Sequence, residues 1–171
     1  DLAIITLMAY GGLREIEANR ASLGDLKTQA GRMTLTVSAK RRTRVVVVKQ
    51  DQEGVIRDWL SERSRVAKLD AGAPLFVSFS LREIGARLST SAIRRMVKAR
   101  YAKAGVVGAR KSTHSLRHSA ITRVIRGGGT PLQTQAFAGH GSFDTTLIYH
   151  HEVSRLEHPA EDLIEYQEKS R

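Results

Sequence analysis

Cysteine is absent from the chain of 171 residues, and its absence excludes disulfide bonds and metal sites built on thiolate ligands. Long apolar runs are absent as well. The longest, at residues 2–9 and 45–48, are too short to span a bilayer, and the N-terminal residues lack the pattern of a signal peptide. We therefore expect a soluble, cytoplasmic protein with no membrane partner.

Internal repeats, low-complexity tracts and interdomain linkers are not visible in the sequence. A length of 171 residues and a hydrophobic content of 41% are enough for one domain with a sizeable core. We expect residues 1–171 to form a single domain.

Basic residues are in large excess and unevenly distributed. The formal net charge is +11. Residues 1–151 contain 25 Lys and Arg against 11 Asp and Glu, whereas residues 152–171 contain three basic and six acidic residues. A body this basic favours a polyanionic partner, with nucleic acid the first candidate. A well-solvated basic surface is the alternative.

Hydrophobic periodicity predicts a mainly helical chain. Helices are expected at residues 2–10, from residue 13, at residues 52–65, 91–104, 115–126 and 159–168, and after Thr130-Pro131 and Ser142. Alternating or β-branched residues at 32–37 and 44–48 predict an antiparallel strand pair joined by residues 38–43, and residues 74–78 are a candidate edge strand. The expected fold class is α+β, mainly α-helical with a small antiparallel β-sheet.

Two clusters of basic residues are candidates for DNA contacts. The connection between the predicted strands contains three consecutive cations, Lys40, Arg41 and Arg42. The exposed face of the helix at 91–104 has five cations and no acid: Arg94, Arg95, Lys98, Arg100 and Lys103. Such groups suit phosphate oxygens, and a basic helix fits a DNA groove. An ordinary solvated surface is the alternative in both cases.

Arg14 occupies an unfavourable place in the sequence. It follows the Gly11-Gly12 turn and lies in the first turn of the predicted second helix, where the helix dipole prefers carboxylates. Glu17 comes three residues later, at a neighbouring position of the helix surface. Either the two form an exposed ion pair worth less than about 1 kcal/mol, or Arg14 is kept there for a function.

Four further residues have side chains suited to catalysis: His114, Arg117, His140 and Tyr149. Each also has a structural interpretation. His114 and His118 are four residues apart, as zinc ligands often are, but no acidic or cysteine partner is near them in the sequence. His118 fits a packing role, and a tyrosine such as Tyr149 is more often a core residue than a nucleophile. We expect no metal site.

The order of these residues resembles a known family. Gly12-Leu13-Arg14-x-x-Glu17, Lys40 in a hairpin, His114-x-Leu116-Arg117-His118, Gly139-His140 and Tyr149 are similar in order and spacing to the catalytic domain of tyrosine recombinases, the phage integrase family. The resemblance covers the chain from the first helix to Tyr149. It departs from the family in the hairpin, where glycines often flank the lysine and this chain has Ala39-Lys40-Arg41-Arg42.

The resemblance implies a role for each matched residue. The resemblance implies that Tyr149 is the nucleophile and that Arg14 and Arg117 clamp the scissile phosphate. It also implies that His114 accepts a proton, that Lys40 is the general acid and that His140 donates to a non-bridging oxygen. Glu17 would hold Arg14, and His118 would support the site. The guanidinium groups of arginine stay charged and bind phosphate oxygens in a bidentate way. Because they supply the positive charge that a metal ion would otherwise provide, neither metal nor cofactor is expected. A free phenol, with a pKa of about 10, is ionised about one time in a thousand at neutral pH, an activation cost of about 4 kcal/mol that cations and a base offset.

The function that the resemblance implies is site-specific recombination of double-stranded DNA through a 3′-phosphotyrosyl intermediate, by a homo-oligomer that forms a tetramer on paired DNA sites at the nucleoid. DNA relaxation of the topoisomerase IB type and a non-catalytic DNA-binding regulator remain alternatives. The family's separate N-terminal DNA-binding domain has no counterpart in this chain, so we expect the chain alone to bind DNA weakly. Residues 159–171 resemble the C-terminal helix that family members exchange between protomers.

Overall fold

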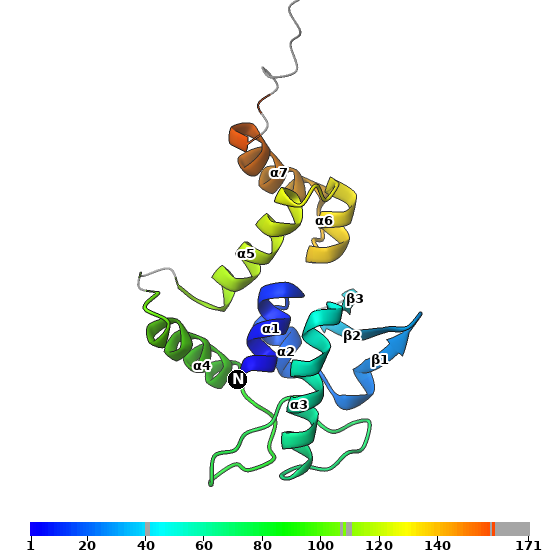
Figure 1. The fold of residues 1–171 in the computed structure, drawn as a ribbon, viewed down its shortest axis with the longest axis vertical. Helices are drawn as coiled ribbons and strands as arrows, with labels where there is room; N and C mark the ends of the chain where they lie inside the picture. Colours follow the sequence, from blue (N-terminus) through cyan, green and yellow to red (C-terminus); the bar gives the residue numbers. More distant parts are fainter. Residues whose placement is uncertain (40–41, 107, 109–110, 158, 160–171) are drawn as a thin grey trace, which may run out of the picture. The chain divides into compact units, whose positions relative to one another are not determined.

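The computed structural model of the chain describes residues 1–39, 42–106, 108, 111–157 and 159 (Figure 1). The chain divides into two compact units, residues 1–120 and residues 121–171, and the division falls within a helix. The first unit contains a small sheet and four complete helices among the described residues, and the described part of the second unit is helical.

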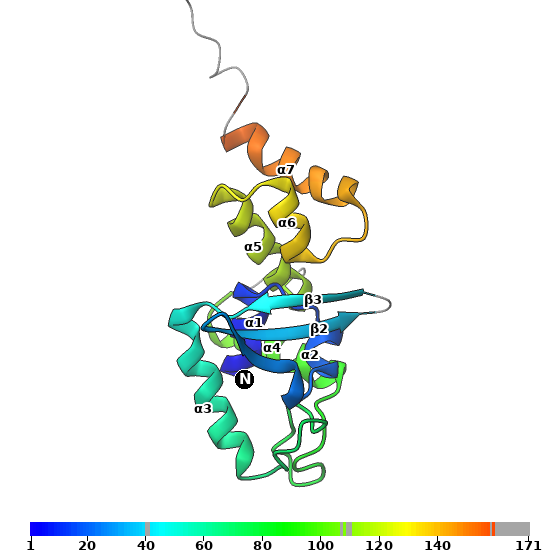
Figure 2. The same cartoon turned by 90° about the vertical axis from the view of Figure 1, so that its right-hand side faces the viewer.

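The sheet of the first unit is an antiparallel meander of β1 (Leu26–Gln29), β2 (Arg32–Ala39) and β3 (Arg42–Val47), in that order (Figure 2). Ala30 and Gly31 both have positive φ and form the two-residue turn between β1 and β2, a turn whose twist suits a hairpin. Leu35 of β2 pairs with Val46 of β3, and both side chains are buried, whereas the residues on either side of Val46 are exposed. One face of β3 therefore belongs to the core.

Four helices contribute apolar side chains to the same core: α1 (Leu2–Tyr10), α2 (Glu15–Arg20), α3 (Glu53–Ser64) and α4 (Thr90–Lys103). Two short 3₁₀ segments, η1 (Leu23–Asp25) and η2 (Gln50–Gln52), precede β1 and α3. Leu13, in the turn between α1 and α2, is fully buried in this core. The turn that leads to Arg14 is therefore anchored by packing.

α5 (Thr113–Arg126) crosses the division between the units, and α6 (Pro131–Ala138) and α7 (Phe143–Glu157) follow it. The predicted caps are confirmed: the Thr130 hydroxyl accepts from the Gln133 N–H at 3.2 Å, and the Ser142 hydroxyl accepts from the Asp144 N–H at 3.1 Å. The core of the second unit is a small cluster that consists of Ile121, Ile125 and Ala138 with Phe137, Tyr149 and Val153 packed against it.

The fold class predicted from the sequence is confirmed, but the sheet differs from the prediction. β1 was not expected, because its residues Leu-Lys-Thr-Gln lack an apolar alternation. Residues 74–78 form only isolated bridges, at Pro74 and Val77, rather than a strand. Side chains of α3 donate hydrogen bonds to backbone carbonyl oxygens that would otherwise accept from a neighbouring strand. Arg63 Nε donates to the Pro74 carbonyl oxygen at 2.8 Å, and Trp59 Nε1 donates to the Leu75 carbonyl oxygen at 3.0 Å.

Two other expectations concern residues that are not described. The hairpin tip residues Lys40 and Arg41 lie outside the described residues, and of Arg42 only the backbone is described. The helix expected at 159–168 also lies outside them, apart from Pro159. Among the described helices, none combines the length and the apolar character that a membrane span requires.

Replacing Leu13 by alanine tests the anchoring of the turn before Arg14. Because the side chain is fully buried, Leu13→Ala is expected to lower the free energy of unfolding by about 2–5 kcal/mol, measured by urea denaturation. Leu81, which is 95% exposed, provides the control, and Leu81→Ala is expected to change stability by less than about 0.5 kcal/mol. Equal stabilities of the two variants would contradict the placement of Leu13.

Candidate active site

The Gly11-Gly12 turn sets the direction in which Arg14 leaves the core. A Cβ atom at Gly11 would lie 2.6 Å from Cγ1 of Val46, and Gly12 has a φ of 61°, so both positions favour glycine. Arg14 is the N-cap of α2 and precedes the first turn instead of lying within it. The backbone N–H of Arg14 donates to Glu17 Oε2 at 2.8 Å, and its Nη1 donates to Oε1 at 3.0 Å.

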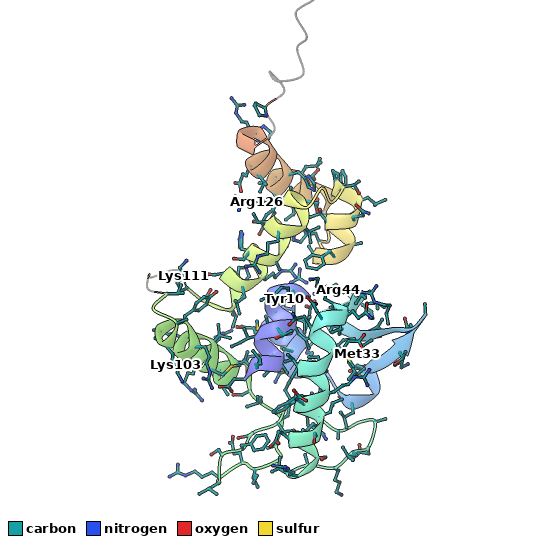
Figure 3. All side chains as sticks on the ribbon, viewed as in Figure 1. Tyr10, Met33, Arg44, Lys103, Lys111 and Arg126 are labelled. Atoms are coloured by element: carbon teal, nitrogen blue, oxygen red, sulfur yellow. The ribbon has the colours of Figure 1, made fainter. Side chains whose placement is uncertain are left out.

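The carboxylate of Glu17 is buried, with 1% of its side chain exposed, between two guanidinium groups. Arg44, which extends from β3 (Figure 3), donates from Nη2 to Glu17 Oε2 at 2.9 Å. Burial raises the pKa of Glu17, but the hydrogen bonds from Arg44 and from the Arg14 backbone outweigh it and hold the pKa below the ordinary value of 4.5. Glu17 is therefore ionised at neutral pH and pairs with both arginines.

The carbonyl groups of the turn are held by arginines from two other elements. Arg44 donates to the carbonyl oxygens of Gly11 at 3.3 Å and Gly12 at 3.0 Å. Arg117, a buried residue of α5, donates from Nη1 to the same Gly12 oxygen. Arg14, Arg44 and Arg117 thus meet around one turn, and Glu17 pairs with Arg14 and Arg44.

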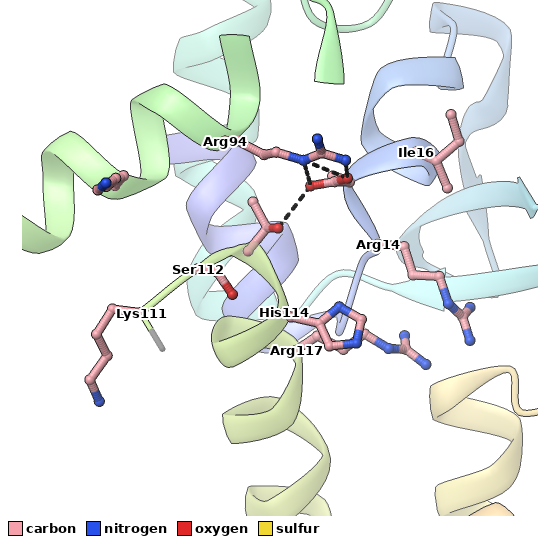
Figure 4. A pocket seen from close by; sticks show the side chains of 10 residues that line it. Arg14, Ile16, Arg94, Lys111, Ser112, His114 and Arg117 are labelled. Carbon is pink, nitrogen blue, oxygen red and sulfur yellow. Dashed lines mark hydrogen bonds and ion pairs between the residues drawn. The ribbon is translucent and has the colours of Figure 1, made fainter. Parts of the chain in front are cut away.

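A pocket of about 460 Å³ opens beside this turn in the first unit (Figure 4). Most of the charged side chains that line it are cations: Arg14, Arg94, Lys98, Lys111 and Arg117. His114 and Glu15 also line it, and Glu15 is the acid of the pocket. A concave surface with this many cations suits an anion that presents several oxygens, such as a phosphodiester.

In the second unit, His140 and Tyr149 lie against one another. Gly139, in the left-handed conformation with φ 58°, ends α6 and turns the chain toward His140. His140 Nδ1 lies 3.0 Å from the hydroxyl of Thr146, a fully buried residue of α7, and this contact orients the imidazole. The His140 and Tyr149 rings stack with centroids 5.6 Å apart and an interplanar angle of 29°.

The remaining histidines have structural surroundings of different kinds. The rings of His114 and His118, both exposed on α5, have centroids 6.1 Å apart. No group of three His, Cys, Asp or Glu side chains suited to a metal ion occurs among the described residues. His150 Nε2 lies 3.0 Å from the hydroxyl of Thr134 and so connects α7 with α6.

The structure brings some of the predicted site residues together within each unit. Arg14, Glu17, His114 and Arg117 gather around the turn and pocket of the first unit, and Arg94 and Lys98 of α4 line the same pocket. Arg95 is exposed on α4 but does not line the pocket. His140 and Tyr149 gather in the second unit.

Sequence reasoning missed four residues of this site. Arg44, Glu15 and Thr113 hold the arrangement through hydrogen bonds, and Lys111 lines the pocket. A signal was available for Arg44. Residues 44, 46 and 48 share one face of the β3 strand and its extension, and Val46 and Val48 are buried. A charged residue in phase with buried ones indicates a buried partner of opposite charge. No such pattern marks the other three.

Glu17→Gln tests the buried ion pair. The folded-state pKa of Glu17 lies below its unfolded value, so its ionisation stabilises the fold above about pH 4.5, and the stabilisation is lost as pH falls through the folded pKa. At pH 7 the variant is expected to be less stable than the wild type by about 3–5 kcal/mol, as for removal of one partner of a buried pair.

The measurement is urea denaturation of both proteins from pH 7 down to pH 3, where the stability difference should shrink. Glu62→Gln is the control, because Glu62 forms an exposed ion pair with Arg65 on the surface. Removing that pair should lower the free energy of unfolding by less than about 1 kcal/mol. A difference between wild type and Glu17→Gln that stays constant with pH would count against the ionised pair.

Comparisons with known proteins agree with this arrangement. The model of the phage integrase family matches residues 1–155. A tyrosine recombinase XerC from Corynebacterium efficiens is 33% identical over 156 residues, which cover 91% of this chain and 47% of that protein. The chain spans about half the length of the curated relatives it matches.

Solved structures share the fold. The crystal structure of XerA recombinase superposes with a TM-score of 0.76 at 29% identity, over 96% of this chain and 58% of that one. XerH site-specific recombinase bound to difH substrate, in a pre-cleavage complex, gives a TM-score of 0.74 at 26% identity, over 95% and 45% of the two chains. Because the family model covers almost the entire sequence, the chain belongs to the phage integrase family.

Proposed function

We propose that this chain is the catalytic domain of a site-specific DNA recombinase, which cleaves and rejoins strands through a 3′-phosphotyrosyl intermediate. The observation that carries the proposal is the pocket of the first unit, where Arg14, His114 and Arg117 lie together. Phosphoryl transfer places negative charge on the equatorial oxygens, and fixed guanidinium groups stabilise that charge. The relatives named tyrosine recombinases and the XerH complex with difH substrate support DNA as the substrate.

The proposed reaction begins when the hydroxyl oxygen of Tyr149 attacks a DNA phosphorus atom. A bond forms between the tyrosine oxygen and phosphorus, and the bond from phosphorus to the 5′-oxygen breaks. The phenol proton passes to His114, and the departing 5′-oxygen takes a proton from Lys40. His140 donates a hydrogen bond to a non-bridging oxygen. A 5′-hydroxyl of another strand then attacks the phosphotyrosyl bond and releases the tyrosine.

Two residues are assigned to supporting roles. Glu17 holds Arg14 in place, as its two hydrogen bonds with that residue suggest. His118, one helical turn from His114, supports the imidazole that accepts the proton. The bond energy of the cleaved strand is retained in the phosphotyrosyl link, so the proposed cycle uses no cofactor.

Basic residues beyond the turn are proposed to bind the DNA backbone: Arg41, Arg42, Arg94, Arg95 and Lys98. The three on α4 are exposed, and Arg94 and Lys98 place their cations in the same pocket as Arg14 and Arg117. We further propose that the longer protein acts at the nucleoid as a tetramer on paired DNA sites, with each protomer supplying one Tyr149.

Tyr149→Phe tests the nucleophile. The chain is incubated, with a metal chelator, with nicked duplex DNA from the ends of the element that encodes it, and covalent protein–DNA adduct is measured on a denaturing gel. Adduct is expected from the wild type and none from Tyr149→Phe.

Arg117→Ala should lower the rate of adduct formation by about 10²–10³-fold, because a donor to the transition-state charge is lost.

Tyr10→Phe is the matched control, since Tyr10 is a half-exposed tyrosine of α1, and it should form adduct at the wild-type rate. Adduct that persists in Tyr149→Phe would exclude this tyrosine as the nucleophile. Adduct that religates only to its own strand would favour DNA relaxation, whereas transfer to a partner duplex supports recombination. No adduct from the wild type at micromolar protein would favour a non-catalytic DNA-binding module.

Deletion of residues 159–171 tests the proposed exchange of the C-terminal segment between protomers. This segment contains four acidic residues against two basic ones, and its charge is complementary to a basic partner surface. We expect the truncated protein to bind a single DNA site as the wild type does but to assemble poorly on paired sites, measured by native gel mobility. Unchanged assembly after the deletion would contradict the exchange.

A further inference from the structure

The carboxylate of Glu15 contacts residues of two other helices and so connects α2 with α4 and α5. Glu15 is the first residue of α2, and its Oε2 accepts a hydrogen bond from the hydroxyl of Thr113, the first residue of α5, at 2.9 Å. Arg94 of α4 also binds this carboxylate, with its Nε 2.8 Å from each oxygen. Thr113 is buried, and 20% of the Glu15 side chain is exposed.

The positions of these two residues in the chain give their hydrogen bond a specific consequence. Glu15 directly follows Arg14, and Thr113 directly precedes His114. The hydrogen bond therefore connects the two helix starts from which Arg14 and His114 extend, although the bonded residues are 98 positions apart. Any change in the separation of these helix starts would move Arg14 and His114 relative to each other.

An acid in this pocket calls for an explanation, because the pocket is otherwise suited to an anion. A carboxylate beside a bound phosphate repels it, so Glu15 weakens phosphate binding through its charge. The hydrogen bond from Arg94 holds the pKa of Glu15 below its ordinary value of 4.5, although partial burial raises it. The carboxylate thus stays ionised at neutral pH and is a strong acceptor for the Thr113 hydroxyl.

We propose that Glu15 is a positioning residue: through its hydrogen bond to Thr113 it fixes the spacing between Arg14 and His114 around the scissile phosphate. This inference rests on the proposed function of the pocket. Glu15 would then raise the rate of strand cleavage, and this gain offsets the phosphate affinity that is lost through its negative charge. Neither Glu15 nor Thr113 touches the phosphate in this proposal, since each acts through its neighbour in the chain.

Variants at both ends of the hydrogen bond separate positioning from charge. Thr113→Val removes the hydroxyl while keeping the shape and charge of the residue, and Thr113→Ser restores the hydroxyl. Glu15→Gln keeps an oxygen acceptor but loses the charge, and Glu15→Ala loses both. Thr28→Val, at an exposed threonine of β1, is the matched control. Thermal melts of all variants check that each one folds.

The rate constant for adduct formation at saturating nicked DNA and the dissociation constant for DNA are measured for each variant. Thr113→Val should lower the rate constant about tenfold, a loss of about 1.4 kcal/mol of transition-state stabilisation, and raise the dissociation constant about threefold. Thr113→Ser and Thr28→Val should keep the wild-type rate constant. Glu15→Ala should bind DNA more tightly than the wild type but have a lower rate constant for adduct formation. The rate constant of Glu15→Gln should fall less than that of Glu15→Ala. The double variant Glu15→Ala/Thr113→Val should have a rate constant no lower than that of the slower single variant, because both changes remove the same hydrogen bond.

A wild-type rate constant in folded Thr113→Val, or tighter DNA binding without loss of rate in Glu15→Ala, would overturn the proposal, because Glu15 would then act only through its charge. If the wild type forms no adduct at all, the proposed function fails by itself. The positioning role is then decided by titration of inorganic phosphate, followed through the NMR signals of His114. Thr113→Val should weaken phosphate binding at least threefold, and unchanged binding would overturn the proposal.

Discussion

The burial of the Glu17 carboxylate governs how the first unit presents its arginines. A carboxylate removed from water is strongly unfavourable unless cations and hydrogen-bond donors surround it, and Arg14 and Arg44 supply both. Arg44 also donates to the carbonyl oxygens of Gly11 and Gly12. Satisfying one buried charge therefore fixes the turn from which Arg14 leaves the core, and the same turn offers Arg117 its acceptor.

Cations gathered in one pocket repel each other before any anion binds, and this repulsion opposes folding. Two acids reduce it in the first unit. Glu17 lies beneath the turn and neutralises charge in the interior, whereas Glu15 lies in the pocket and pairs with Arg94 of α4. The five cations of the pocket still exceed its one acid. The pocket thus remains attractive to a phosphate, and the fold tolerates its charge.

The sequence predicted most of the helices and the α+β class, because hydrophobic periodicity and the caps at Thr130 and Ser142 are local features. It did not predict β1, whose four residues have no apolar alternation. The sequence also misplaced Arg14 within the first turn of a helix. Arg14 is instead the N-cap, and the first turn contains Glu15 and Glu17, as the helix dipole favours. The conflict noted in the sequence was therefore a boundary error of two residues, because the helix was expected from residue 13 and begins at Glu15.

The candidate site was less predictable than the fold, for a physical reason. Arg44 and Thr113 act through partners 27 and 98 positions away. The phase of Arg44 with buried Val46 and Val48 indicates a buried partner but does not identify it, and no local pattern marks Thr113. Tyr149 presents the opposite difficulty. It packs in the small apolar core of the second unit and stacks on His140, so its surroundings do not distinguish a nucleophile from an ordinary core tyrosine. The assignment of Tyr149 as nucleophile rests on the order of residues in the chain, whereas the contacts of Arg44 with Glu17 and with the Gly11-Gly12 turn were found only in the structure.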